Sequence, residues 1–147
     1  MSVDLRFEPS LNLVVLTFRG AVTLSDHLSA LHACARDPRY NRAQSGLVDL
    51  ERCSLNNHFF DEVQVLARTF RKLFGEGPSD GIWSVHAPGD VVYGIGRMLQ
   101  SVLDGTGRRV AVSRTRGEAL DAIPLDRTTR EYGDFRARWL FRWGLAA

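Results

Sequence analysis

The sequence lacks the features that would place it in a specialised class of protein. Only two cysteines occur, Cys34 and Cys53, and they form no CxxC pair. Neither has a histidine at a metal-ligand spacing, so we expect free thiols and no metal site. The longest apolar run, residues 13–16, is far shorter than the roughly 20 residues of a membrane-spanning helix, and no basic and then apolar leader precedes it. We therefore expect a soluble, cytoplasmic protein.

Excess positive charge is also absent from most of the chain. The 147 residues carry a net charge of +2, and the excess lies in residues 124–147, where five arginines stand against three acidic side chains. Non-specific binding to nucleic acid needs a clustered cationic surface, so we expect no nucleic-acid partner. With 44% hydrophobic and 24% charged residues, the composition is that of one ordinary globular domain.

The pattern of apolar residues predicts a β-hairpin followed by three strands, with a helix after every strand but the first. We expect strands at 4–8, 11–19, 46–50, 82–87 and 110–112, and helices at 23–37, 57–74, 90–103 and 115–123. Thr23 with Asp26 and Thr115 with Glu118 have capping-box spacing, while Asn57 and Asp90 are the other expected N-caps. The order β-β-α-β-α-β-α-β-α predicts an α/β fold, a single mixed and mostly parallel sheet with helices packed on it, in a domain of residues 1–123.

The stretch 81–104, a strand, a turn and a helix, is the centre of this prediction. Its helix carries one apolar stripe, formed by Val91, Val92, Ile95, Met98, Leu99, Val102 and Leu103. Gly94 and Gly96 lie within the helix, where each costs roughly 1 kcal/mol relative to alanine, so we expect the helix to approach a strand or another subunit closely. Because these glycines fall inside the helical repeat, the pattern does not favour a phosphate-binding loop.

Polar side chains gather where the predicted parallel strands end, which is the usual place for a ligand crevice in an open α/β sheet. The candidates at this edge are Asp49, Glu51, Arg52, Cys53, Ser54, His86, Asp90, Arg114 and Arg116. Asp49 either anchors the buried strand through donors or a cation, or faces a ligand. None of these residues forms a nucleophile, a base and an orienting group at a known spacing, so we expect no catalytic residue and no cofactor. A contact of His86 with Asp90 would be a capping detail.

A second candidate surface lies on the helix 90–103. Tyr93 and Arg97 are one turn apart on its outward side. Arg97 either stacks on the Tyr93 ring, or the two side chains contact a protein partner.

Three segments, LVDL at 47–50, HAPGDVVYGIGRMLQ at 86–100 and VAVSRTRGEALDAI at 110–123, together with the order of strands and helices, resemble the SpoIIAA-like branch of the STAS family. The resemblance covers residues 4–123 and implies a regulatory or binding domain without chemistry of its own. In the anti-sigma-factor antagonists of this family, a serine or threonine at the start of the helix after the LVDL-like strand is phosphorylated. Here His58 or Phe59 holds that position, and Ser54 comes too early to replace it, so the resemblance implies that the switch is absent. Other branches of the fold are associated with apolar or lipid-like ligands.

The C-terminal extension, residues 124–147, is unusually rich in aromatic side chains. They are Tyr132, Phe135, Trp139, Phe141 and Trp143. A helix from about Arg136 would group Trp139, Leu140 and Trp143 on one side, which could anchor the extension on its own domain, in a second subunit or at a lipid interface.

We expect a non-enzymatic regulatory or binding domain that acts through a protein partner, not identified by the sequence. We also expect a homodimer, formed through the extension or the helix 90–103. The alternative is a carrier or sensor that holds a small apolar or anionic ligand at the carboxyl ends of the strands.

Overall fold

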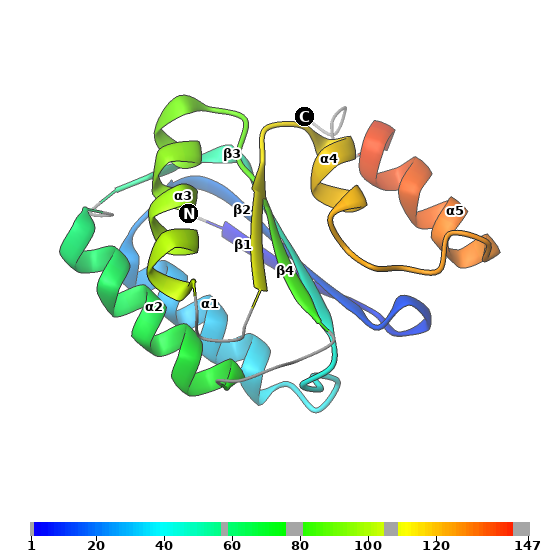
Figure 1. Ribbon diagram of the computed structural model, residues 1–147, viewed down its shortest axis with the longest axis horizontal. Coiled ribbons are helices and arrows are strands. Elements are labelled where there is room, and N and C mark those ends of the chain that lie inside the picture. The colour runs from blue at the N-terminus through cyan, green and yellow to red at the C-terminus, as the bar shows by residue number, and fades with distance from the viewer. Residues whose placement is uncertain (1, 57–58, 76–80, 105–108, 143–147) are drawn as a thin grey trace.

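The computed structural model describes residues 2–56, 59–75, 81–104 and 109–142, and it contains one five-stranded sheet (Figure 1). The strands are β1 (Ser2–Glu8), β2 (Leu13–Val22), β3 (Ser45–Leu55), β4 (Ile82–His86) and β5 (Arg109–Ser113). They lie side by side in sequence order; β1 is antiparallel to β2, and every other pair is parallel. The predicted mixed sheet, with its N-terminal hairpin and β1 at an edge, is confirmed. A short 3-10 turn, η1 (Pro9–Leu11), closes the hairpin.

Three helices cover one face of the sheet, and two helices with one turn of π-helix cover the other (Figure 1). The first group is α1 (Leu24–Arg36), α2 (Phe60–Phe74) and α3 (Asp90–Leu103), and the second is α4 (Arg116–Asp121), α5 (Arg130–Ala137) and η2 (Arg138–Arg142). Because the parallel strands advance in one direction, right-handed crossovers put α1, α2 and α3 on the same face. No helix in the described ranges is long and apolar enough to cross a membrane.

The opposite face is closed by α4 and by the C-terminal extension, which packs on the sheet of its own chain. Leu13 and Val15 of β2 point to this face, while Val14 and Leu16 point to the other, as the period of two in a strand requires. Leu13 and Val15 belong to the apolar cluster on the α4 and α5 side of the sheet. The other buried members of this cluster are Leu11, Leu47, Ala119, Leu120, Ile123, Tyr132, Phe135 and Trp139. The helical part starts at Arg130, earlier than predicted. Trp143 lies outside the described residues.

Several element boundaries differ from the predictions. Residues 51–55, expected as a loop, continue β3, because Arg19–Val22 of β2 pair with Arg52–Leu55 after a shift in register. The N-cap of α3 is Gly89, and the carboxylate of Asp90 accepts a hydrogen bond from Arg114 instead of capping the helix. The predicted cap Asn57 lies outside the described residues, and Phe59 precedes α2 without a side-chain cap bond.

The apolar stripe predicted for the helix 90–103 is shorter in the structure, where Val91 is 69% exposed. Phe60 of α2 is 57% exposed. Both residues lie in the first turn of their helix. The remaining positions of the predicted stripe are buried or half-buried.

Gly94 and Gly96 should respond in opposite ways to alanine. The predicted close approach to a strand is confirmed at Gly96, where an added Cβ would lie 2.9 Å from Val112 of β5, while nothing lies within 4 Å of one at Gly94. We expect Gly94→Ala to raise the free energy of unfolding by about 0.8–1 kcal/mol through helix propensity. Gly96→Ala should lower it by about 1 kcal/mol, because the stiff valine must move. Urea unfolding of both variants is the measurement. If both substitutions stabilise the protein, the contact with Val112 does not limit the size of the side chain at position 96.

Candidate functional site

A row of polar residues crosses the sheet on the face covered by α4 and η2. Thr17, Asp49 and His86 are register partners on β2, β3 and β4 and are buried. His86 Nδ1 lies 3.0 Å from Asp49 Oδ1, and the ring nitrogen donates, since an ionised carboxylate only accepts. The backbone N–H of Glu51 donates to the same oxygen over 3.1 Å. The carboxylate of Asp49 is thus held in the middle of β3, level with the last residue of β4.

Arg116, the first residue of α4, pairs with this carboxylate from above the sheet. Its Nη1 donates to Asp49 Oδ2 over 3.1 Å and lies 3.6 Å from the carboxylate of Glu51. Its guanidinium also lies 3.7 Å from the centre of the Trp139 ring. Arg116 Nε donates to the Trp139 carbonyl over 2.6 Å, and Trp139 Nε1 donates to the Arg116 carbonyl over 2.8 Å. Arg116 therefore joins the sheet to the C-terminal extension.

The pKa of Asp49 lies below its ordinary value of 3.8. Burial, the largest single influence, raises it, but the hydrogen bond from His86, the charge of Arg116 and the Glu51 N–H together outweigh burial. The carboxylate is consequently ionised and compensated within its own chain. These contacts favour structural anchoring as the role of Asp49, one of the two alternatives left by the sequence.

The other polar candidates do not join this cluster. Arg114 pairs with the exposed carboxylate of Asp90 over 2.7 Å, and its guanidinium lies 4.2 Å from the centre of the Tyr93 ring. Of the two alternatives for Arg97, the structure does not show stacking on Tyr93: Arg114 contacts that ring, and Arg97 is exposed. His86 contacts Asp49 and not Asp90.

The predicted crevice is thus divided by the sheet. Asp49, Glu51 and His86 lie toward α4, whereas Asp90, Tyr93 and Arg114 belong to the α3 side. Arg52 and Ser54 continue β3, and Ser54 is exposed. His58 lies outside the described residues. Within the part of the chain that the structure describes, no three His, Cys, Asp or Glu side chains are placed to hold a metal ion.

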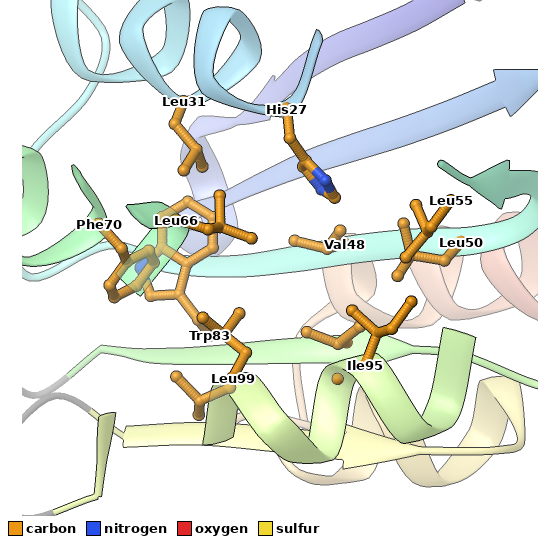
Figure 2. A pocket seen from close by; sticks show the side chains of 13 residues that line it. His27, Leu31, Val48, Leu50, Leu55, Leu66, Phe70, Trp83, Ile95 and Leu99 are labelled. Atoms are coloured by element: carbon orange, nitrogen blue, oxygen red, sulfur yellow. The ribbon is translucent and has the colours of Figure 1, made fainter. Parts of the chain in front are cut away.

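An apolar cavity lies on the opposite face, between the sheet and α1, α2 and α3 (Figure 2). Its volume is about 50 Å³. The helices line it with His27, Leu31, Leu66, Phe70, Ile95, Gly96 and Leu99, and the strands with Val48, Leu50, Leu55, Trp83, Val85 and Val110. No sequence pattern indicates this cavity, because its walls show the same apolar periodicity as a filled core.

The polar atoms of the cavity wall are few. Trp83 Nε1 is buried without a hydrogen-bond partner among the described residues, but the Phe70 ring stands perpendicular to the indole at a centroid distance of 5.3 Å. Figure 2 shows the indole nitrogen beside Phe70, an arrangement suited to a weak N–H to ring interaction. His27, packed 4.5 Å from the Phe18 ring, is the one titratable side chain among the thirteen that line the cavity. The cavity is suited to an apolar occupant.

No protein-family model matches the chain, and no curated protein matches it. Among solved structures, the chain is similar to an uncharacterized protein of the DUF3478 family from Shewanella loihica PV-4, which has a SpoIIAA-like fold. The two are 13% identical in sequence; the match has a TM-score of 0.51 and covers 83% of this chain and 92% of that one. The SpoIIAA-like fold expected from the sequence is thereby confirmed, and the likeness extends to the fold alone.

Proposed function

We propose that this protein is a non-enzymatic binding domain that carries or senses a small apolar molecule in the cavity beneath α1, α2 and α3. The cavity itself supports the proposal. Protein interiors are packed about as densely as organic crystals, and a void of about 50 Å³ would cost about 1 kcal/mol at roughly 24 cal/mol per Å³. Empty apolar cavities stay dry and accept apolar guests. A ligand that fills the space recovers the lost contacts.

The chemistry of the wall defines the class of ligand. The charged groups near the carboxyl ends of the strands lie outside this cavity, and its wall is formed almost wholly by aliphatic and aromatic side chains. A neutral, compact molecule therefore fits better than an anion, because a buried charge would have no counter-ion. Of the apolar and anionic ligands that the sequence left open, we propose the apolar one.

Xenon, an apolar atom small enough for this cavity, should bind to the wild-type protein and not to a variant whose cavity is filled. We expect xenon to raise the unfolding midpoint and to shift the methyl resonances of Leu31, Val48 and Ile95, because a ligand that binds only the folded state stabilises it. Leu50→Phe directs a ring into the cavity and should weaken binding at least about tenfold, a loss of roughly 1.4 kcal/mol. Heteronuclear NMR titration is the measurement.

The control for this experiment is Phe141→Leu, a change of similar size at an exposed position on the other face. Circular dichroism without xenon verifies that both variants fold. Equal xenon binding by wild type and Leu50→Phe would exclude the cavity as the site. Native mass spectrometry of freshly purified protein would in addition reveal a retained natural ligand.

A protein partner, the first expectation from the sequence, is the second candidate. One observation favours it: Phe59 and Phe60 are adjacent at the start of α2 and are 71% and 57% exposed. Exposed apolar groups that lie together mark interaction surfaces. We rank this function second because the cavity defines the chemistry of its ligand, whereas two exposed rings do not define a partner. The homodimer and the cytoplasmic location stay predictions, and sedimentation equilibrium tests the first.

A further inference from the structure

We propose that the apolar ligand enters and leaves the cavity at the carboxyl edge of the sheet, between the N-terminal ends of α2 and α3, and that Phe59 and Val91 form the rim of this entrance. The inference rests on the proposed function, since it concerns access to the same cavity. It assigns a role to exposed side chains that pack against nothing in the core.

The burial of the cavity wall is the first observation. Val48, Leu50 and Trp83 are buried deep in the wall, whereas Leu55, the last residue of β3, and Ile95 of α3 are half-buried. Figure 2 places Leu55 and Ile95 on the same side of the cavity. The wall is therefore thinnest where β3 ends and α3 begins.

The opposite side of α3 is fastened to the sheet. Gln100 Nε2 donates to the Val110 carbonyl over 2.9 Å, and Gly96 packs directly against Val112. These contacts close the cavity along β5, where the other half-buried members of its wall, Leu99 and Val110, lie. A ligand would have to break them to pass on that side.

Apolar side chains lead from the cavity out to solvent along α3 and at the start of α2. Val91, Ile95 and Leu99 recur every four residues and so share one face of α3; Leu99 and Ile95 line the cavity and Val91 is exposed. Phe59, the residue before the first turn of α2, is likewise exposed, and Leu66 further along α2 lines the cavity. In Figure 1 the N-terminal ends of α2 and α3 lie apart, with the end of β3 between them. An apolar molecule at this edge meets a continuous apolar path to the cavity.

The entrance can be tested by adding a charge to its rim without altering the cavity wall. Val91→Glu is suited to this purpose, because a carboxylate in the first turn of a helix is favourable and the variant should fold. Phe141→Glu is the matched control, since Phe141 is similarly exposed but lies on the other face of the sheet. The probe is xenon, a heavy atom small enough for the cavity, which quenches the fluorescence of Trp83 in the cavity wall. A Trp83→Phe variant shows which part of the fluorescence quenching comes from Trp83.

Stopped-flow mixing with xenon-saturated buffer should show that Val91→Glu slows both association and dissociation of xenon by about fivefold, because the ligand must displace the water that solvates the new carboxylate. Its Kd should stay within about twofold of the wild-type value, and Phe141→Glu should change neither rate nor Kd. Unchanged rates in Val91→Glu would overturn the entrance while leaving the cavity as a binding site. A weaker Kd at an unchanged association rate would also overturn it, since Val91 would then belong to the site. Absence of saturable quenching in wild type would overturn both proposals.

Discussion

Replacing Arg116 with methionine should lower the free energy of unfolding at pH 7 by about 3–5 kcal/mol, the usual effect of removing one partner from a buried ion pair. The Asp49 carboxylate, 4% exposed, would lose its cation while remaining shielded from water. The Trp139 carbonyl would lose its donor as well. Urea unfolding followed by circular dichroism measures the difference.

Two further variants separate charge compensation from simple loss of contacts. Arg114→Met removes an arginine whose partner, Asp90, is exposed, and should cost less than about 0.5 kcal/mol. Adding Asp49→Leu to Arg116→Met should recover much of the stability, since the uncompensated charge is then gone. If Arg116→Met costs no more than Arg114→Met, the buried pair does not stabilise the fold.

The ion pair of Asp49 and Arg116 also makes the stability of the fold depend on pH. The pKa of Asp49 is lower in the folded protein than its ordinary value of 3.8. Its contribution to stability is therefore complete above about pH 4 and is lost as the pH falls through the folded-state pKa. In Arg116→Met the pKa of Asp49 rises because the favourable charge is absent, so acid unfolding of this variant should start at a higher pH than that of wild type.

Truncation of Trp139 to alanine should have the second large effect, about 4 kcal/mol of destabilisation, within the range for large aromatic side chains in cores. Trp139 is fully buried between Arg116, His86 and Phe135. The change removes its ring contacts and the indole donor to the Arg116 carbonyl. Thermal unfolding and native-state hydrogen exchange measure the effect.

Hydrogen exchange should locate this loss in one layer of the protein. In Trp139→Ala the amides of α5 and η2 should exchange faster, while those of α1 and α2, on the other face, should lose less protection. Phe141→Ala, at an exposed position of η2, should change stability by less than about 0.5 kcal/mol. Equal effects of the two substitutions would show that the extension is not held by Trp139.

The elements that the sequence predicted are those determined by local patterns. Thr23 and Asp26 form a complete capping box, and Glu118 N–H donates to Thr115 Oγ1, because such contacts need only residues three apart. The period of two along β2 likewise determines which of its side chains share a face. These features depend on backbone geometry within one element, so the fold class followed from them.

Contacts between segments that are distant in the sequence could not be predicted from local patterns. The buried carboxylate of Asp49 implied a cation or donors, but no spacing could select Arg116, 67 residues further along the chain. A cavity is harder still, since it depends on how far apart the packed elements lie. Leu50, Ile95 and Leu99 have the periodicity expected of a filled core, and only their arrangement in three dimensions reveals the space between them.

The sequential order of the strands also has a consequence for biosynthesis. A ribosome delivers the chain from its amino end, so β1 to β5 and the helices α1 to α3 emerge before α5 and η2. Until Tyr132, Phe135 and Trp139 have been translated, Leu13, Val15 and Leu47 have no aromatic cover. The nascent protein therefore passes through a stage with one finished and one bare apolar surface, at which chaperones or neighbouring nascent chains could bind.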